Sequence, residues 1–377
     1  MSLDRACADL ATVEAATPLG WGDRAIRPAR ESSLVALLAG SSPAADGQAE
    51  AGGNGRGYDL VTVSAGLPGR RPTGISALTR WQVSGPPLAT LSSSPDGRAL
   101  ALTFFGSDEC TEPVVVRFPG ASVLQPFAST AARPVIPIGW APAGRRLAAI
   151  VSGVGLAIWD ESTGRLTVPA LPCFACGQLA SAAWSGDGSR IEALFTRPCP
   201  ARDGCDWFGL ATFSVGAARV QPFAGWEVQD PRWLDEVQHG EGARLLGWAD
   251  ASHVALALGS RVAVVPVDPS GPGRFVALRA PDAVLSPDGR LIAWPGRDGA
   301  RVVGVEVADI SGGTSHVSRR VWSTPAGVGI GGTVSLAWAP DSSRLGIGLR
   351  DQIWVGGVDG GFVRVPGAAR PIAALTW

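Results

Sequence analysis

A five-residue phrase that recurs along the chain constrains the fold more than any other feature. The phrase SPDGR occupies residues 94–98 and returns unchanged at residues 286–290. Degraded copies lie at residues 141–145, 185–189, 249–253 and 339–343. In the full phrase, Pro presets φ for a turn, Asp bonds the neighbouring backbone and Gly accepts a left-handed conformation. The phrase therefore predicts tight hairpin turns, and its spacing scatters around the ~40–50 residues of a structural repeat.

Short strands are predicted on both sides of each turn. The strand before the turn often ends in Trp, and the strand after it is alternating or apolar, as in residues 99–105 and 344–347. A third strand and a more polar fourth strand follow, as in residues 155–159 and 165–168. Four short strands per unit are typical of a β-propeller blade.

The two ends of the chain supply complementary parts of one further blade. Residues 33–39, 58–64 and 74–82 are predicted as second, third and fourth strands without a first strand before them. Residues 371–377 are predicted as a first strand with nothing after it. Joining these fragments would hide the exposed edges of an open array. The first blade is therefore expected to consist of residues 33–82 plus 371–377.

These observations predict an all-β fold. We expect a seven-bladed β-propeller of four-stranded antiparallel blades, closed by a C-terminal strand that completes the first blade. Residues 33–377 would form this single domain after an N-terminal extension over residues 1–32. Six blades are the alternative, because the Gly- and Ala-rich stretch from residue 41 to residue 57 weakens the first unit.

The repeat also carries a family resemblance. The pattern Trp-Ser-Pro-Asp-Gly-Arg-x-Leu-Ala, spread over residues 87–377, resembles the WD-repeat-like propeller modules of the TolB family and related exported bacterial proteins. The departures are that two copies keep the full phrase, that the dipeptide Trp159-Asp160 occurs once, and that no TolB-type N-terminal domain is evident. The resemblance implies the propeller fold and a role in binding.

Charge and hydropathy exclude several partners. The net charge is −1, and all 32 Lys and Arg positions are Arg. A chain this neutral offers no electrostatic footprint for nucleic acid, so no nucleic-acid partner is expected. No apolar stretch approaches the ~18–20 residues of a transmembrane helix. Met1 is the only Met and no signal peptide follows it, which fits a start placed after a removed export signal.

Six cysteines predict an oxidising environment. In an exported chain they suggest three disulfides, with Cys7 paired to Cys110 and two bonds within the remaining four. The pairing among those four stays open: Cys173, Cys176, Cys199 and Cys205. A tetrahedral zinc site built from the same four thiols is the alternative, and free thiols are a third possibility. The expected location is therefore extracytoplasmic: secreted, periplasmic or a membrane-anchored ectodomain.

The longest connection between predicted strands, residues 225–243, is the candidate ligand-binding segment. Long loops in compact folds are often functional. This one combines aromatic anchors with carboxylates and an imidazole: Trp226, Asp230, Trp233, Asp235, Glu236 and His239. A solvated insertion across the rim is the alternative interpretation.

A second aromatic set lies on the predicted first strands at Trp140, Trp184, Trp248, Trp338 and Trp377. Packing between neighbouring blades is the expected role of this set. A carbohydrate platform is its functional alternative.

Catalytic residues are not evident in the sequence. The three histidines are not expected to converge, and no G-x-S-x-G nucleophile elbow is present. We therefore expect no catalytic residues, no metal, no cofactor and no enzymatic activity. The leading expectation is a monomeric, non-catalytic extracytoplasmic scaffold that binds a protein, peptide or cell-envelope ligand through its loop face. The alternatives are a propeller lyase or hydrolase that uses His239 with Glu236 or Glu241, and the sensory ectodomain of a membrane-anchored protein.

Overall fold

The fold is described from a computed structural model of the chain. The description covers residues 33–39, 55–64, 74–84, 88–105, 111–117, 122–127, 135–151, 154–169, 178–198, 206–215, 224–228, 243–268, 274–277, 280–311, 318–325, 330–331, 334–367 and 372–377. Within these ranges there are strands and turns but no helix, which confirms the predicted all-β class. Accordingly, no helix in these ranges is long and apolar enough to cross a membrane.

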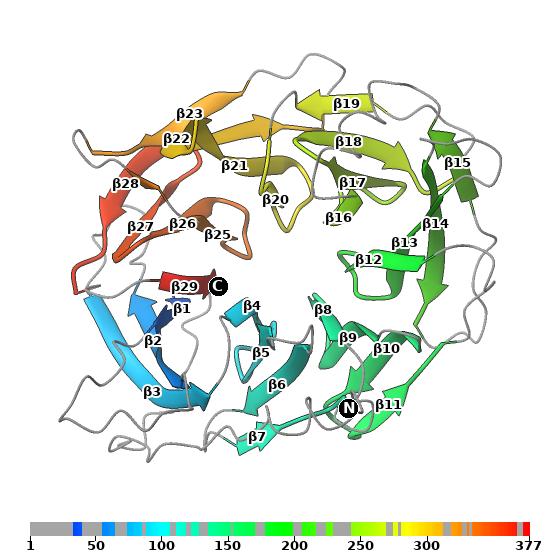
Figure 1. The fold of residues 1–377 in the computed structure, drawn as a ribbon, viewed down its shortest axis with the longest axis horizontal. Helices are drawn as coiled ribbons and strands as arrows, with labels where there is room; N and C mark the ends of the chain where they lie inside the picture. The colour runs from blue at the N-terminus through cyan, green and yellow to red at the C-terminus, as the bar shows by residue number, and fades with distance from the viewer. Residues whose placement is uncertain are drawn as a thin grey trace. The chain divides into compact units, whose positions relative to one another are not determined.

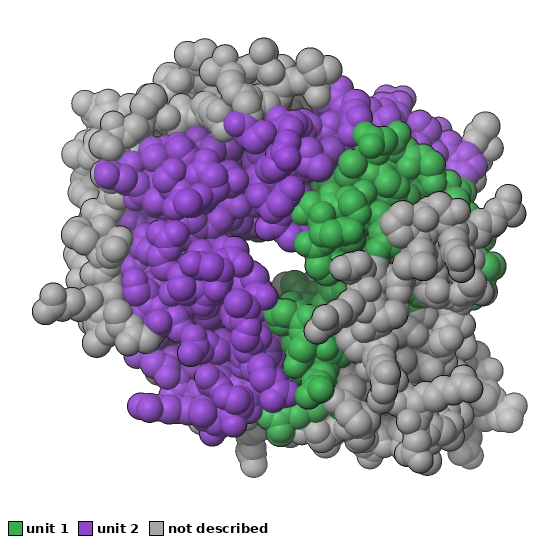
Figure 2. All heavy atoms as spheres, turned by 180° about the vertical axis from the view of Figure 1, so that it is seen from behind, with its two compact units in different colours: residues 1–137, 151–153, 332–377 green, residues 138–150, 154–331 purple. Residues whose placement is uncertain are grey.

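The chain divides into two compact units, which Figure 2 distinguishes by colour. Unit 1 consists of residues 1–137, 151–153 and 332–377, and unit 2 consists of residues 138–150 and 154–331. Between them the described strands form seven sheets, and the paired strands are antiparallel. Six sheets have four strands and one has five, so the predicted four-stranded antiparallel architecture is confirmed.

Three sheets belong to unit 1 (Figure 1). The first has the order β29 (Ile372–Thr376), β1 (Ser33–Ala39), β2 (Gly55–Ser64) and β3 (Gly74–Ser84). The second contains β4 (Leu88–Ser93), β5 (Ala99–Phe105), β6 (Thr111–Arg117) and β7 (Ser122–Leu124). The third contains β25 (Val334–Trp338), β26 (Arg344–Leu349), β27 (Gln352–Gly357) and β28 (Gly360–Arg364).

Four sheets lie wholly or mainly in unit 2. The first comprises β8 (Val135–Trp140), β9 (Arg146–Val151), β10 (Gly155–Asp160) and β11 (Arg165–Thr167). The second comprises β12 (Gln178–Trp184), β13 (Arg190–Pro198), β14 (Asp206–Ser214) and β15 (Ala224–Val228). The third comprises β16 (Ala243–Trp248), β17 (His253–Leu258), β18 (Arg261–Pro266) and β19 (Arg274–Ala277). The fourth comprises β20 (Val284–Leu285), β21 (Leu291–Asp298), β22 (Arg301–Asp309), β23 (Arg319–Ser323) and β24 (Ile330–Gly331).

The recurrent phrase forms the turn between the first two strands of a sheet, as predicted. In the copy at residues 286–290, the Ser286 hydroxyl donates to Asp288 Oδ1 at 2.6 Å and accepts the Leu291 amide at 2.9 Å. The Gly289 amide donates to the Ser286 carbonyl at 2.9 Å, with φ at +75°. A Cβ at Gly289 would also collide with the Trp248 carbonyl, so this turn requires glycine on two grounds.

The last strand of the chain pairs with the first one (Figure 1). Strand β29 lies antiparallel to β1, with Leu375 opposite Ala36 and a register shift between Leu37 and Leu38. The sheet β29–β1–β2–β3 therefore combines residues from both ends of the sequence.

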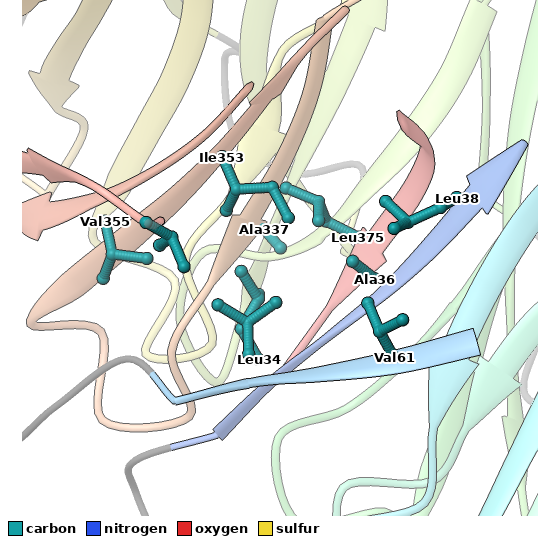
Figure 3. Packing of buried hydrophobic residues seen from close by; sticks show 10 residues of the cluster. Leu34, Ala36, Leu38, Val61, Ala337, Ile353, Val355 and Leu375 are labelled. Carbon is teal, nitrogen blue, oxygen red and sulfur yellow. The ribbon is translucent and has the colours of Figure 1, made fainter. Parts of the chain in front are cut away.

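A buried apolar cluster holds this sheet against the sheet β25–β28 in unit 1 (Figure 3). Leu34 and Ala36 from β1, Val61 from β2 and Leu375 from β29 contribute from one side. The other sheet contributes Ala337, Ile353 and Val355. Alternation of side chains along each strand directs these residues to one face, where their burial stabilises the contact.

A two-residue strand lies inside the glycine-rich segment of residues 325–332. Ile330 and Gly331 form this short strand, β24. These residues pair with Val302 and Arg301 of β22. The alternation rule missed this strand because two residues are too few to show a period.

Candidate functional site

The predicted binding segment lies almost entirely outside the described residues. The exception is Trp226, which belongs to β15, where its backbone pairs with Phe208 of β14. The other candidates lie in the undescribed range 229–242: Asp230, Trp233, Asp235, Glu236 and His239. The assignment of these residues to a ligand site therefore remains a prediction.

The six cysteines also lie outside the described residues. They are Cys7, Cys110, Cys173, Cys176, Cys199 and Cys205. The predicted disulfides and the alternative zinc site both remain predictions. Within the described ranges, no group of three or more His, Cys, Asp and Glu side chains could hold a metal ion.

His253 is the histidine whose surroundings the structure describes. It begins β17, and its Nδ1 lies 2.9 Å from Asp250 Oδ1. Partial burial alone would raise the pKa of Asp250, but hydrogen bonds from Ser252 and His253 hold that pKa below its usual value. The pair lies on an exposed turn, where such an interaction is worth little.

Three of the recurrent tryptophans, Trp184, Trp248 and Trp377, bridge neighbouring sheets through their indole N–H groups. Trp184 Nε1 donates to the Gly139 carbonyl at 3.0 Å, and Trp248 Nε1 donates to the Ala183 carbonyl at 3.3 Å. In unit 1, Trp377 Nε1 donates to the Ala337 carbonyl at 3.0 Å. The rings are largely buried, with Trp184 7% exposed and Trp248 8% exposed. This arrangement favours the packing role over an exposed carbohydrate platform.

Two further contacts accompany the tryptophan bridge. The Ser181 hydroxyl accepts the Leu245 amide at 3.1 Å, and the Arg190 guanidinium lies 4.5 Å from the centroid of the Trp248 ring. The Trp248 indole bond, the Ser181–Leu245 hydrogen bond and the cation–π contact of Arg190 therefore fix the sheet β12–β15 to the sheet β16–β19.

A buried acid lies inside this contact. Glu192 on β13 is 0% exposed, and Thr212 on β14 donates its hydroxyl to Glu192 Oε2 at 2.6 Å. The two residues face each other in the strand register, and Leu194 and Leu210 form the next pair on the same side. Because Leu194 and Leu210 pack against the sheet β16–β19, the Glu192 side chain is directed to that sheet as well.

Among the described residues, Glu192 Oε1 has no hydrogen-bond partner. Burial raises the pKa of Glu192 to about 7, while the Thr212 hydroxyl and the charge of Arg190 partly oppose that rise. A carboxyl group with this pKa exchanges its proton near neutral pH. Among the described acids with a stated pKa, Glu192 is therefore the one whose pKa lies furthest from its usual value.

The other sheets carry a different pair at this place. The position can be located from the turn between the first two strands of a sheet. In the turn before β13, the Ser185 amide donates to the Arg190 carbonyl, and Glu192 lies two residues after Arg190. The equivalent hydrogen bond marks the same position in the other sheets. Its occupants elsewhere are Ala101, Ala148, Ala255, Ala293 and Gly346. Where the register to the next strand is given, the residues opposite are Val115, Val264, Val307 and Val355. In the sheet β12–β15, Glu192 therefore takes the place of Ala or Gly, and Thr212 takes the place of Val.

The sequence analysis missed this pair, although a signal for it was present. Aligning the second strands on the turn phrase would have placed Glu192 in a column of Ala and Gly. An acid in such a column is a buried-acid candidate, because the column faces the neighbouring sheet. The residues nominated from the sequence lie instead between the predicted strands, where binding residues usually concentrate.

No family model and no curated protein matches the sequence. Solved structures do resemble the fold. "A putative 6-phosphogluconolactonase" from Bacteroides fragilis matches with a TM-score of 0.52 and 14% identity, over 92% of this chain and 98% of its own. A protein described in the same words from Bacteroides uniformis matches with a TM-score of 0.51 and 14% identity, over 92% and 99%. TolB from Acinetobacter baumannii has a TM-score of 0.44 and 14% identity, over 91% and 82%.

The two Bacteroides likenesses, with TM-scores above 0.5, support a β-propeller fold, as the repeat predicted. At 14% identity they show the fold and do not transfer a function.

The expectation that the protein is not an enzyme is contradicted. Both Bacteroides structures are described as putative 6-phosphogluconolactonases, so proteins with this architecture include ones described as enzymes. The sequence argument failed because it searched for motifs of other hydrolase folds, whereas a propeller draws its chemistry from individual loop residues.

Proposed function

We propose that residues 33–377 form one seven-bladed β-propeller, closed by β29, that binds a protein or peptide partner outside the cytoplasm through residues 225–243. The single observation that carries the proposal is the aromatic and acidic composition of the segment that joins two regular, cross-linked sheets. Binding residues concentrate on loops that a rigid scaffold positions. The segment that leaves β15 at Val228 and enters β16 at Ala243 contains Trp233 and Asp235.

Aromatic side chains anchor protein interfaces, and carboxylates set the charge of the partner they accept. Trp233 and Asp235 are therefore the residues on which the binding proposal concentrates. The expected partner presents an apolar pocket for an indole beside a basic group.

A capture experiment tests this role. The immobilised protein is cross-linked in a cell-envelope extract, and capture by the wild type is compared with capture by Trp233→Ala/Asp235→Ala. The matched control, Asp298→Ala/Arg301→Ala, removes two exposed side chains from the β21–β22 turn. A partner retained by the wild type and the control but lost by the Trp233/Asp235 variant supports the proposal. Equal capture by all three proteins contradicts it.

The proposed location is tested by counting free thiols and bound metal in monomeric protein purified without reductant. Three disulfides predict no free thiol and no metal. Four thiols released together with one zinc ion would contradict the disulfide proposal and the oxidising location.

A second candidate function is hydrolysis of a sugar lactone. The observation in its favour is the likeness to the two Bacteroides proteins described as putative 6-phosphogluconolactonases. Purified protein would be assayed for hydrolysis of 6-phosphogluconolactone, with His239→Ala as the active-site variant. Turnover by the wild type that is lost in the variant would favour the enzyme. A rate equal to the spontaneous rate would remove this candidate.

A further inference from the structure

The contact between the sheets β12–β15 and β16–β19 contains polar groups that packing does not require. The equivalent positions in other sheets carry Ala or Gly opposite Val. Val and Thr have nearly the same shape, so Thr212 adds a hydroxyl rather than volume. That hydroxyl bonds the carboxyl of Glu192 at 2.6 Å. The acid and its partner therefore occur together, in the same sheet.

The surface that faces Glu192 is apolar. Leu245, Trp248, Val254 and Leu256 of the sheet β16–β19 belong to the same buried cluster as Leu194 of β13. An ionised carboxylate in such surroundings costs free energy unless its oxygens are bonded. Thr212 satisfies Oε2, whereas Oε1 has no partner among the described residues.

Among the described residues, the other charged or titratable groups named near this contact are Arg190, Asp250 and His253. Arg190, two residues from Glu192 on β13, lies over Trp248 and donates to the Ala251 carbonyl at 3.3 Å. Asp250 and His253 form their own pair on the turn that precedes β17. Strands β12 and β14 add the neutral groups Ser181 and Thr212.

We propose that the Glu192–Thr212 pair is a proton-sensitive contact, which loosens the packing of the sheet β12–β15 on the sheet β16–β19 when Glu192 ionises. In the protonated form, the carboxyl is neutral and tolerates an apolar face. After the proton leaves, Oε1 carries charge with no hydrogen-bond partner among the described residues, and water reaches it when the two sheets separate locally. The raised pKa of Glu192, about 7, supports this assignment.

The direction of the effect follows from proton linkage. The pKa of Glu192 is raised from 4.5 in the exposed state to about 7 in the closed contact. Protons therefore bind the closed contact more tightly than the open one. The contact is most stable below about pH 4.5, and its stability falls as the pH rises to about 7, above which it levels off.

The loosening also bears on ligand binding, a consequence that rests on the proposed function. Residues 229–242 connect the two sheets, leaving β15 after Val228 and entering β16 at Ala243. The two ends of the proposed binding segment are therefore anchored in the two sheets that meet at Glu192. The proton-sensitive contact itself does not depend on that function, so the test below uses no ligand.

Hydrogen exchange between pH 5 and pH 8.5 tests the proposal, with amide rates corrected for the intrinsic effect of pH. In the wild type, the opening constant for peptides from β13, β14, β16 and β17 is expected to rise about tenfold per pH unit between pH 5 and pH 7, then level off. Glu192→Gln is expected to remove that rise. Peptides from β21 and β22, which carry the Ala293–Val307 pair, serve as the internal reference and are expected to show no rise.

Two further variants keep the test decisive. Imidazoles as a class titrate near neutral pH, so His253→Gln is included and is expected to retain the rise. If Glu192→Gln does not fold, Glu192→Ala/Thr212→Val replaces it, because other sheets fold with that type of pair. A flat wild-type profile overturns the proposal. So does a rise that survives removal of Glu192, or one that disappears with His253.

Discussion

Two sheet contacts in this molecule share the same connecting groups but differ in the residue at their centre. In unit 2, Trp248, Ser181 and Arg190 join the sheet β12–β15 to the sheet β16–β19. In unit 1, Trp377 donates to the Ala337 carbonyl at 3.0 Å, and Ser335 accepts the Leu375 amide at 3.0 Å.

The third connecting group is also shared. Arg344 lies 4.9 Å from the centroid of the Trp377 ring, as Arg190 lies over Trp248. The central position is Glu192 in the first contact and Gly346 in the second. A Cβ at Gly346 would lie 3.0 Å from Leu34 Cδ2, so a leucine fills the space there.

The comparison separates two tasks that the repeat performs. The connecting groups fix how one sheet lies on the next, and they recur because their geometry depends on the turn and the strand register. The central position is free to vary once those groups are in place. In one contact it admits a neighbouring leucine, and in the other it holds an ionisable group.

The largest expected effect comes from placing the acid in the wrong contact. Gly346→Glu would bury a carboxyl against Leu34, with Val355 opposite in the place that Thr212 takes beside Glu192. We expect a loss of about 4 kcal/mol in the free energy of unfolding at pH 8, from overpacking and an uncompensated charge. Chemical denaturation at pH 5 and pH 8 measures it. A loss under about 1 kcal/mol would mean that the two contacts are not equivalent.

The next effect comes from making the unit 2 contact resemble the others. Glu192→Ala/Thr212→Val removes a carboxyl whose raised pKa costs about 3 kcal/mol of stability once the pH exceeds 7. A small cavity cost of about 1–2 kcal/mol opposes this gain. We expect the variant to be less stable than the wild type at pH 5 and more stable at pH 8. Urea titrations at both pH values test the change of sign, and the same sign at both would contradict it.

Replacing Arg344 or Arg190 should cost less stability than the changes above, and the cost should be larger for Arg344. Arg344 is buried beside Trp377, whereas Arg190 is partly exposed over Trp248. Desolvation strengthens a cation–π contact. We therefore expect Arg344→Gln to cost about 2 kcal/mol and Arg190→Gln about 0.5–1 kcal/mol. Thermal unfolding of both variants measures the order, and a larger loss from Arg190→Gln would reverse the interpretation.

The smallest effect is expected from the serines, and it should be equal in the two contacts. Ser181→Ala and Ser335→Ala each leave one backbone amide without its hydroxyl acceptor. Each loss should cost about 1 kcal/mol. Exchange rates of the Leu245 and Leu375 amides report it directly. Unequal losses would show that the connecting groups differ in strength despite their similar geometry.

Much of the fold could be predicted from local sequence, because its turns are specified locally. The phrase at residues 286–290 determines its own hydrogen bonds through Ser286 and Asp288, which need no distant partner. The same applies to Asp187, whose pKa is lowered to about 2, first by the hydroxyl of Ser185 in the same turn. Strand positions on either side followed from these turns, and β5 occupies the predicted residues 99–105.

The candidate site was harder to predict because burial is not a local property. Glu192 looks like an ordinary strand residue in a short window, between Ile191 and Ala193. Its character depends on which face it occupies and on what covers that face. The loop residues from Asp230 to His239 were easier to nominate, since their composition alone is unusual, but their role remains a proposal.

The sequence by itself determined that this chain is built from short antiparallel strands joined by Ser-Asp-Gly turns, with tryptophans at the ends of strands that precede those turns. Those features arise from backbone preferences and side-chain bonds within about five residues. Only the tertiary structure decided that Glu192 faces an apolar sheet with Thr212 as its partner. The physical reason is that strand pairing and face-to-face packing join residues far apart in the chain, and a buried charge acquires its pKa only from the surroundings that this packing creates.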